Sequence, residues 1–470
     1  MTGNLRTWIG FLSTGLAAGF LSVCSASRAD EPVKLVGLIQ ENSAASQAAD
    51  SAPAPADPVA AMLASLDNCI WERPKLGGSL CGLRYCLAEN GILFDADLVQ
   101  VYQGVSSGGL NTTFKYGGHA DYVLNIDMDK AAGLKGLFFK MRTETLYGEA
   151  VGFADSGAIL PPSLITNLPR PEENETAITD FLFTQFFSES FGVFFGKMDT
   201  LDGDANAFAH GRGKDQFMNS SLCFNPIAAR TVPYSTLGVG FMILQERQPI
   251  FTFSVLDPVD SATTSGFDSL YEEGVVLAAE LRLPTNFFCL PGHQLFGAMW
   301  SSRNFVALEQ DPRVLLPIIG IPSPIPITEK DDSWAFTYNF DQYLVVDPCD
   351  PRRGWGVFGR AGVSDGNPNP LEWFVSAGVG GSSPICGRER DTFGIGYYHS
   401  AASDELGPVL GSLFGDTDGV ELFYNIEVTP WFHLTADLQI IDQGFAGAPA
   451  LGVKDPDPAV ILGLRGKIDF

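Results

Sequence analysis

The segment Gly104–Gly108 has the G-x-S-x-G pattern that surrounds the nucleophilic serine of many hydrolases. In those enzymes a strand leads into the serine and a helix follows it, whereas here the turn-forming residues Gly109 and Asn111 come next. A serine nucleophile also needs a histidine as its base. The five histidines lie on five different segments: His119, His210, His293, His399 and His433. We therefore interpret the pattern as a loop between strands, and we expect that the chain is not an enzyme.

A second pattern, Asp202-Gly203-Asp204-Ala205-Asn206, resembles the first half of a calcium-binding loop. Such a loop has glycine at its sixth position and glutamate at its twelfth, and this chain has Ala207 and Gly213 there. An acidic turn is the better interpretation. The weaker alternative is a calcium site with these ligands: Asp202, Asp204 and Asn206. The sequence suggests no other metal and no organic cofactor.

The N-terminus has the three parts of a secretory signal peptide. Arg6 provides the positive charge, Trp8–Cys24 is apolar, and Ser27–Ala29 forms a small-x-small cleavage pattern. Residues 1–29 are therefore predicted to be a signal peptide that exports the chain. A lipoprotein signal is the less favoured alternative, because Val23 is too large for the position before a lipidated cysteine.

Charge limits the partners of the exported chain. Loss of residues 1–29 removes two arginines and no acid, which changes the formal net charge from −26 to −28. This charge argues against nucleic acid and anionic membrane surfaces as partners. Hydrophobic residues make up 45% of the chain. Even so, no stretch after the signal peptide supplies the roughly 20 consecutive apolar residues of a membrane helix.

From Gly91 to the C-terminus the main pattern is an alternation of apolar and polar residues. In one example, Tyr122 and Leu124 alternate with Asp121 and Asn125. Side chains alternate between the two faces of a strand, so the pattern indicates strands with one apolar and one polar face. The pattern recurs in further segments: Lys135–Gly148, Glu273–Leu283, Trp334–Asp341, Val420–Val428, Phe432–Ile440 and Val460–Phe470.

The connections between these strands alternate between short and long. We count about sixteen strands, with short turns near 128–134, 245–249 and 284–293 and long loops near 148–177 and 200–233. Short turns at one rim and long loops at the other are typical of an outer-membrane barrel. In lipid such a sheet must close on itself, because every backbone group needs a partner. The predicted fold is all-β: a 16-stranded antiparallel transmembrane barrel around a water-filled lumen.

Several stretches resemble one known family in their order and spacing. They are Leu76–Gly78 with Leu87–Ile92, Phe94–Asp97 and Gln100–Gly104; Phe195–Asp199 with Asp204–Phe208 and Gln216–Asn219; and Phe358–Arg360 with Gly387, Arg388, Asp391 and Glu421–Gln439. Together they make the chain, from about residue 76 to 470, similar to the carbohydrate-selective porin (OprB) family.

The resemblance implies a 16-stranded barrel in the bacterial outer membrane, with an opening helix and a narrowed middle through which small sugars diffuse passively. The implied partners are small sugars, outer-membrane lipid and the outer-membrane assembly machinery, for which the terminal Phe470 resembles a recognition signal. A homo-oligomer is compatible with it. Two alternatives remain open, a barrel with a structural or adhesive role and a general non-selective solute pore.

The lumen wall should contain the groups that meet the sugar. Sugar hydroxyls both donate and accept hydrogen bonds, so basic side chains facing acidic ones can replace their water. An aromatic ring such as Phe194, Phe195 or Phe358 would stack on a sugar ring. The candidates for lining the pore and contacting sugar are the charged residues on polar faces: Lys140, Arg142, Glu144, Lys197, Glu280, Arg282, Arg360, Glu421, Glu427, Asp437 and Arg465.

The predicted organisation has four parts. Residues 1–29 form the signal peptide, 30–75 a flexible periplasmic linker rich in alanine, proline and serine, 76–90 a short helix, and 91–470 the barrel. Only about sixty residues separate the signal peptide from the barrel, too few for the plug domain of an energy-coupled transporter.

Cysteines fall into two groups in this organisation. An exported chain allows disulfides, and the absence of any C-x-x-C pair argues against zinc. The candidates are Cys69, Cys81 and Cys86 before the barrel, and Cys289, Cys349 and Cys386 in short turns of the barrel. Because all three of those turns lie at one rim, we expect at least one disulfide to join two of them.

Overall fold

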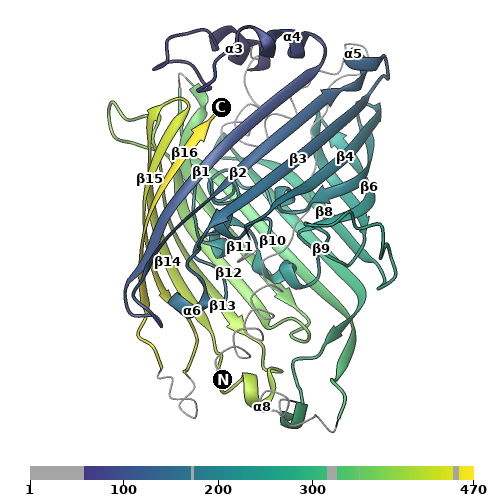
Figure 1. The fold of residues 1–470 in the computed structure, drawn as a ribbon, viewed down its shortest axis with the longest axis vertical. Coiled ribbons are helices and arrows are strands. Elements are labelled where there is room, and N and C mark those ends of the chain that lie inside the picture. Colours follow the sequence, from purple (N-terminus) through teal and green to yellow (C-terminus); the bar gives the residue numbers. More distant parts are fainter. Residues whose placement is uncertain (1–57, 171–173, 315–324, 349, 448–454) are drawn as a thin grey trace.

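The structure, a computed structural model, describes residues 58–170, 174–314, 325–348, 350–447 and 455–470. Sixteen strands follow one another around a closed barrel, and β16 pairs with β1 to close it (Figure 1). The strands are β1 Ile92–Ser107, β2 Phe114–Asp127, β3 Leu137–Gly148, β4 Thr176–Ser188, β5 Phe191–Asp199, β6 Ser235–Gln245, β7 Gln248–Leu256, β8 Val276–Phe287, β9 Leu290–Val306, β10 Glu329–Asp347, β11 Asp350–Ser364, β12 Leu371–Ser382, β13 Thr392–Ala402, β14 Thr417–Thr429, β15 Phe432–Asp442 and β16 Ala459–Asp469. The predicted fold class is confirmed.

The helices of the described part are short. They are α3 Pro58–Ser65, α4 Leu83–Glu89, α5 Met128–Ala132, α6 Phe153–Ser156, η3 Ile165–Asn167, η4 Leu201–Gly203, α7 Ser220–Cys223, η5 Pro226–Arg230 and α8 Gly407–Leu410. None of these helices has both the length and the apolar character needed to cross a membrane.

Strand connections have two to nine residues at one end of the barrel, and most of those at the other end are longer. Several turns have two residues, and in one of them Phe288 and Cys289 have φ angles of 59° and 61°, the mirror-image turn that suits a twisted hairpin. This corrects the predicted connection near 284–293, which is too long. Pro284 suggests a turn, but it lies inside β8 opposite His293 of β9.

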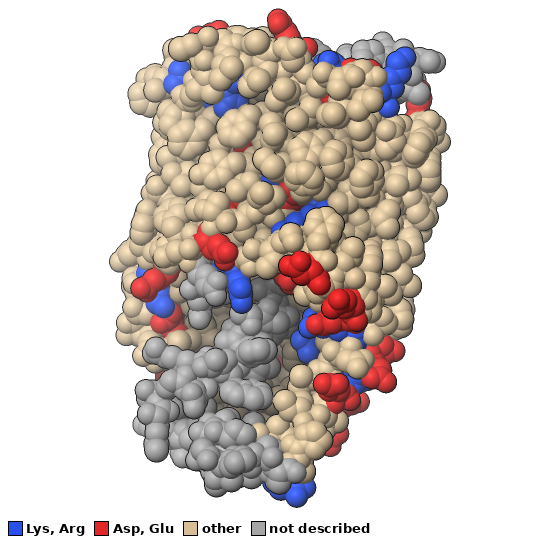
Figure 2. All heavy atoms as spheres, turned by 45° about the vertical axis from the view of Figure 1, so that its right-hand side comes forward, with Lys and Arg blue, Asp and Glu red and all other residues tan. Residues whose placement is uncertain are grey.

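Neighbouring residues of a strand face opposite environments. On β2, Tyr122 is 41% exposed and Asp121 is fully buried; on β16, Leu464 is 47% exposed and Arg465 is fully buried. The outer surface is therefore an apolar belt, which Figure 2 shows as a mainly tan band between the charged rim at the top and the acids of the lower half. The inner surface is polar, as the alternation in the sequence predicts.

Residues 58–91 lie across the end of the barrel that has the short turns (Figure 1). Helix α4 lies within the predicted helix 76–90. The prediction of a flexible linker up to residue 75 is wrong in its last part, which contains α3 and docks on the barrel. Distant contacts order it, such as the 2.6 Å hydrogen bond from Trp431 Nε1 to Ile70 O, and composition cannot reveal these. The predicted signal peptide and the rest of the linker lie outside the described residues.

Candidate functional site

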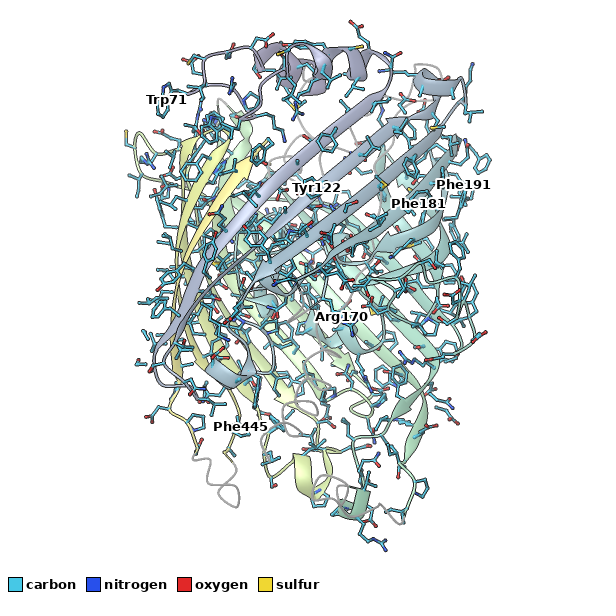
Figure 3. All side chains as sticks on the ribbon, viewed as in Figure 1. Trp71, Tyr122, Arg170, Phe181, Phe191 and Phe445 are labelled. Atoms are coloured by element: carbon cyan, nitrogen blue, oxygen red, sulfur yellow. The ribbon has the colours of Figure 1, made fainter. Side chains whose placement is uncertain are left out.

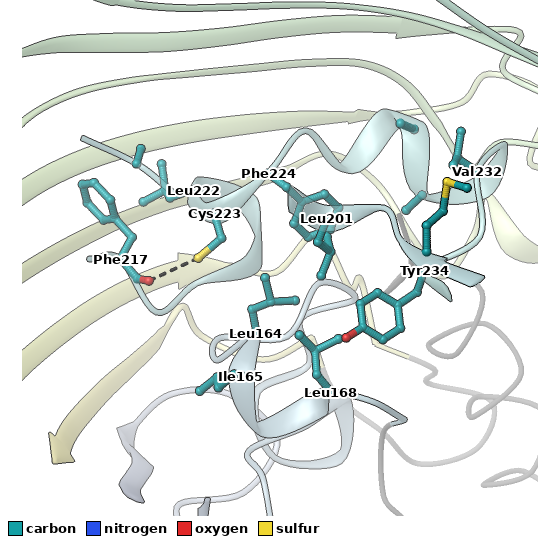
Figure 4. Close-up of a cluster of buried hydrophobic side chains, with 14 of the residues drawn as sticks. Leu164, Ile165, Leu168, Leu201, Phe217, Leu222, Cys223, Phe224, Val232 and Tyr234 are labelled. Atoms are coloured by element: carbon teal, nitrogen blue, oxygen red, sulfur yellow. Dashed lines mark hydrogen bonds between the residues drawn. The ribbon is translucent and has the colours of Figure 1, made fainter. Parts of the chain in front are cut away.

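Two of the long connections fold into the barrel. We call residues 151–169 the first inner segment and residues 200–234 the second inner segment; most residues of both are buried. Their apolar side chains pack in one cluster (Figure 4). A backbone hydrogen bond of 2.8 Å from Leu164 N to Met218 O also joins them. The two segments therefore form one inner body that narrows the lumen.

Aromatic side chains of the wall pack on this inner body. The Phe217 ring lies 5.3 Å from that of Phe358 on β11 and 4.9 Å from that of Phe423 on β14. Phe358 and Phe194 are only 1% exposed, while Phe195 is 46% exposed on the lipid-facing side. The structure thus contradicts the expectation that these three rings face sugar, because they pack on protein or face lipid.

A cluster of buried charges holds the second inner segment to the wall of β1–β5. Arg142 Nη1 on β3 lies 2.8 Å from Asp202 Oδ2 and 3.1 Å from Asp199 Oδ2. Lys140 Nζ lies 3.0 Å from Asp180 Oδ2 and 3.2 Å from Asp202 Oδ2. Burial alone would raise the pKa of Asp202, but the charges of Arg142 and Lys140 hold it well below its usual range. The carboxylate therefore stays charged and binds the segment to the wall.

Arg212 is the central cation that the second inner segment contributes. Its guanidinium donates hydrogen bonds to the carboxylates of Glu144 and Asp199. It also donates to the hydroxyl of Tyr234, which in turn donates to Glu144. Glu144 and Asp199 are fully buried and Arg212 is 4% exposed. Paired charges are tolerated there because each has an opposite partner and hydrogen bonds.

Lys214 completes this cluster on the side of β1 and β2. Its Nζ lies 2.8 Å from Asp97 Oδ2 and 2.7 Å from Asp121 Oδ2. Burial alone would lower the pKa of Lys214, but Asp121 and Asp97 raise it above its ordinary value. We call the whole set the ionic cluster: Lys140, Arg142, Arg212 and Lys214 with Asp97, Asp121, Glu144, Asp180, Asp199 and Asp202.

Asp204 lies in different surroundings from Asp202. Asp204 Oδ2 accepts a hydrogen bond of 2.7 Å from Arg360 Nε. Asn339 donates to the other Asp204 oxygen, and Asn206 Nδ2 donates to Asn339 Oδ1 at 2.7 Å. The groups of the weaker, calcium-binding alternative thus have basic or amide partners. In the described part no group of three histidine, cysteine, aspartate or glutamate side chains is arranged to hold a metal ion, and we propose no calcium site.

All three guanidinium nitrogens of Arg360 on β11 donate hydrogen bonds to the second inner segment. Besides the contact with Asp204, its Nη1 donates to Leu222 O at 3.0 Å and its Nη2 to Ala209 O at 2.6 Å. Its side chain is fully buried. Arg360 therefore supports the segment, and sugar reaches it only if the segment moves.

Three candidates at the C-terminal strands also hold the inner body. Glu421 accepts hydrogen bonds from the backbone N–H groups of Met218 and Asn219. Arg465 Nη1 donates to Gly213 O at 2.6 Å. Asp437 Oδ1 accepts a 2.9 Å hydrogen bond from Gln439 Nε2, which also donates to Pro162 O at 2.8 Å.

Two further candidates lie apart from the inner body. Glu427 is half-buried near the short turns, where its carboxylate lies 3.1 Å from Arg390 Nη1. Lys197 Nζ on β5 donates to Ala262 O at 3.1 Å and to Thr264 O at 2.8 Å. Lys197 thus binds the loop between β7 and β8.

Glu280 and Arg282 of β8 differ from the other candidates. They are two residues apart on the inward face, with Leu281 exposed between them on the outside. Within the described residues, neither side chain has a hydrogen-bond partner or a salt bridge, although each lies in the electrostatic field of the other. Of the eleven candidates, these two are the ones without a hydrogen-bond or ion-pair partner among the described residues; Glu280 is 7% exposed and Arg282 is half-buried.

Comparison of the sequence with family profiles then identifies the family. The profile of the family described as carbohydrate-selective porin, OprB family, matches residues 111–470, which is most of the chain. The chain belongs to this family. The resemblance seen in the sequence is confirmed, and this OprB-family chain is an outer-membrane porin for carbohydrates.

Solved structures agree with the OprB-family fold. The chain is similar to OprB of Pseudomonas putida in its high-pH structure, with a TM-score of 0.70 and 19% identity over 85% of this chain and 99% of that one. For the low-pH structure of the same protein the TM-score is 0.51, with 15% identity over the same shares of the two chains. None of the curated protein sequences matches.

Sequence reasoning on this porin missed the residues of the inner body that pair with the barrel wall. Arg212 and Lys214 were not among the candidates, because residues 200–233 were treated as a long loop. The wall acids of the ionic cluster were missed as well: Asp97, Asp121, Asp180 and Asp199. A signal was present in residues 200–233: Phe208, Phe217 and further apolar residues are too many for a loop in water. The G-x-S-x-G stretch ends β1, and no helix lies between it and β2.

The cysteines of this porin are free thiols in the described part. They are Cys69, Cys81, Cys86, Cys223, Cys289 and Cys386. Cys289 and Cys386 lie in short turns at one end, as predicted, but the structure shows no disulfide between them. Cys349 lies outside the described residues. Cys223 is buried in the second inner segment, and burial raises the pKa of its thiol.

Proposed function

We propose that small neutral sugars cross this porin by passive diffusion along the β7–β8 side of the lumen, between that wall and the inner body. The main support is the distribution of polar contacts. Ion pairs and hydrogen bonds bind the inner segments to β1–β5 on one side and to β10–β16 on the other. Among the described residues, no hydrogen bond or ion pair joins either inner segment to β7 or β8.

The wall along this route has groups that suit sugar hydroxyls. Thr252 and Ser254 of β7 face inward beside Glu280 and Arg282 of β8. In the β7–β8 register Thr252 is directly opposite Glu280. Carboxylates accept and guanidinium groups donate charge-assisted hydrogen bonds, so the pair offers one acceptor group and one donor group to sugar hydroxyls. The observation that carries the proposal is that Glu280 and Arg282 have no hydrogen-bond or ion-pair partner among the described residues.

We expect the double variant Glu280→Gln/Arg282→Gln to bind sugar about tenfold more weakly, which corresponds to about 1.4 kcal/mol and to the loss of charge-assisted hydrogen bonds. Conductance in potassium chloride should change much less, because the inner body keeps its contacts. The measurement is single-channel current in a planar bilayer, titrated with glucose and with a disaccharide as blockers.

The matched control for this pair is Glu246→Gln/Arg247→Gln. These two residues have the same charges but form the exposed turn between β6 and β7. The control should leave sugar block unchanged. Equal effects of both variants on sugar block would refute the proposed route. A wild-type current that sugars do not block would favour a non-selective pore. The absence of any current would favour a structural or adhesive barrel.

The long loops give this porin an acidic outer mouth. Their exposed acids include Glu149, Asp268, Glu272, Glu273, Glu309, Asp404, Glu405, Asp416, Asp455 and Asp457. In the described parts of these loops, leaving out the second inner segment, the only exposed bases are Arg170 and Arg313. Figure 2 shows several acids on the lower half of one face. Such a field attracts cations and repels anions.

We therefore expect potassium to be more permeant than chloride at low salt, as measured by the reversal potential across a potassium chloride gradient. The preference should fade as salt rises, because the screening length falls from about 30 Å at 0.01 M to about 3 Å at 1 M. A preference for chloride, or one that does not depend on salt, would contradict this electrostatic origin.

We also propose that residues 1–29 direct export and are then removed, and that the chain has no enzymatic activity. The support for export is the charge and apolar pattern of the N-terminus. Edman sequencing of the chain purified from outer membranes tests the cleavage site, with Asp30 expected as the first residue. A mature chain that starts elsewhere would contradict it.

A further inference from the structure

The turn between α3 and α4 exposes two large apolar side chains. The N–H of Glu72 donates to Cys69 O at 2.9 Å, which closes a tight turn with Ile70 and Trp71 at its corner. Ile70 is 45% exposed and Trp71 is 70% exposed. A turn corner is the most projecting part of the chain, and in water it normally has small or polar residues. These two residues therefore need an apolar environment that the described part of the chain does not supply.

The turn is fixed to the barrel at its periplasmic rim. Trp431, in the turn between β14 and β15, donates to Ile70 O at 2.6 Å. Leu76 N donates to Asp469 O at 2.7 Å, and Lys75 Nζ lies 2.8 Å from the Asp95 carboxylate. Contacts on both sides of Trp71 thus hold this turn against the ends of β1, β15 and β16. Figure 3 shows Trp71 at the edge of the barrel, at the end that carries α3 and α4.

The outer wall beside this turn is the surface that faces lipid. At the same rim Val428 of β14 is 47% exposed, Phe94 of β1 is 41% exposed and the C-terminal Phe470 is 38% exposed. Trp71 therefore extends the lipid-facing apolar surface of the barrel beyond the ends of the strands, into the region where membrane and water meet. Tryptophan prefers this depth of a membrane, because its ring is apolar while its N–H seeks polar groups.

We propose that Ile70 and Trp71 insert among the phospholipids of the periplasmic leaflet, so that residues 69–72 anchor the N-terminal segment to the membrane beside β14–β16. The indole ring lies at the level of the headgroups and Ile70 adds apolar contact. The segment before the barrel thereby acts as an interfacial anchor, in addition to its contacts with the strands. Phospholipid is the occupant because the turn borders the lipid-facing wall and not the lumen.

The test places the full chain in vesicles made only of phospholipid, with bromine quenchers either near the headgroups or near the chain ends. The emission of wild type minus that of Trp71→Phe reports on Trp71 alone. We expect headgroup-level bromine to reduce this difference about twofold, and bromine near the chain ends to reduce it less. Aqueous iodide should quench it weakly.

A second variant moves the reporter by one residue, Ile70→Trp in the Trp71→Phe background, and should be quenched in the same way. Both variants alter exposed side chains, and folding is checked by heat-modifiable migration on gels. Strong quenching by iodide and none by either bromolipid would overturn the proposal, and would indicate a face left free for a periplasmic protein.

Discussion

Replacing Arg212 by alanine is expected to release the second inner segment from the wall of β3 and β5, and to raise single-channel conductance while making it fluctuate. The change leaves the buried carboxylates of Glu144 and Asp199 without their main partner. Breaking a buried ion pair in this way costs about 3–5 kcal/mol. The segment would then adopt alternative positions that enlarge the lumen. Planar-bilayer recording and the unfolding temperature of the purified porin measure the two effects.

The matched control is Arg313→Ala, which breaks an ion pair with Asp311 in which Arg313 is largely exposed. An exposed pair contributes at most about 1 kcal/mol, so conductance and stability should stay near wild type. If Arg212→Ala leaves both quantities as unchanged as the control does, the ionic cluster does not position the inner body.

Replacing Leu464 by arginine is expected to prevent most molecules of the porin from folding into the membrane. Leu464 is 47% exposed on the outer face, at the middle of β16 and opposite Tyr102 of β1. A basic residue on the lipid face near mid-bilayer costs about 2–4 kcal/mol. Here it also weakens the strand pair that closes the barrel. The folded fraction, measured as the heat-modifiable form on gels, should fall steeply.

The control at this position is Leu464→Met, a volume-conserving change that should cost less than about 1.5 kcal/mol. A folded fraction for the arginine variant equal to that of the methionine variant would mean that β16 does not present Leu464 to lipid.

The barrel was predictable because its physics is local and repeated. Tyr122 and Asp121 alternate in the sequence because one meets lipid and the other the lumen, and the same rule holds on every strand. Sixteen strands and their faces follow from that rule together with the turn lengths. The turn at Pro284 was misplaced because proline occurs both in turns and within strands. Only the pairing of Pro284 with His293 of β9 shows that it lies within a strand here.

The inner body was not predictable from the same reasoning. A long connection that stays outside the barrel and one that folds into its lumen look the same in the sequence, because both simply separate two consecutive strands. The pairing of Arg212 with Glu144, separated by 68 residues, leaves no local pattern, and neither does that of Arg360 with Asp204, separated by 156. The charged residues of the polar faces mostly bind the inner body or a loop, and only the contacts of the folded barrel reveal these partners.

The closing seam determines the order in which this chain can be assembled. Arg84 donates hydrogen bonds to Phe94 O at 2.8 Å and to Phe470 O at 2.6 Å, the second across 386 residues. Such a contact requires nearly the whole chain to be synthesised first, and its loop-closure entropy is among the largest the chain can incur. Until then the edges of β1 and β16 are unpaired and prone to aggregation. The barrel therefore closes only after its last strand has met the N-terminal segment, and until then the unpaired edges of β1 and β16 can pair with other chains.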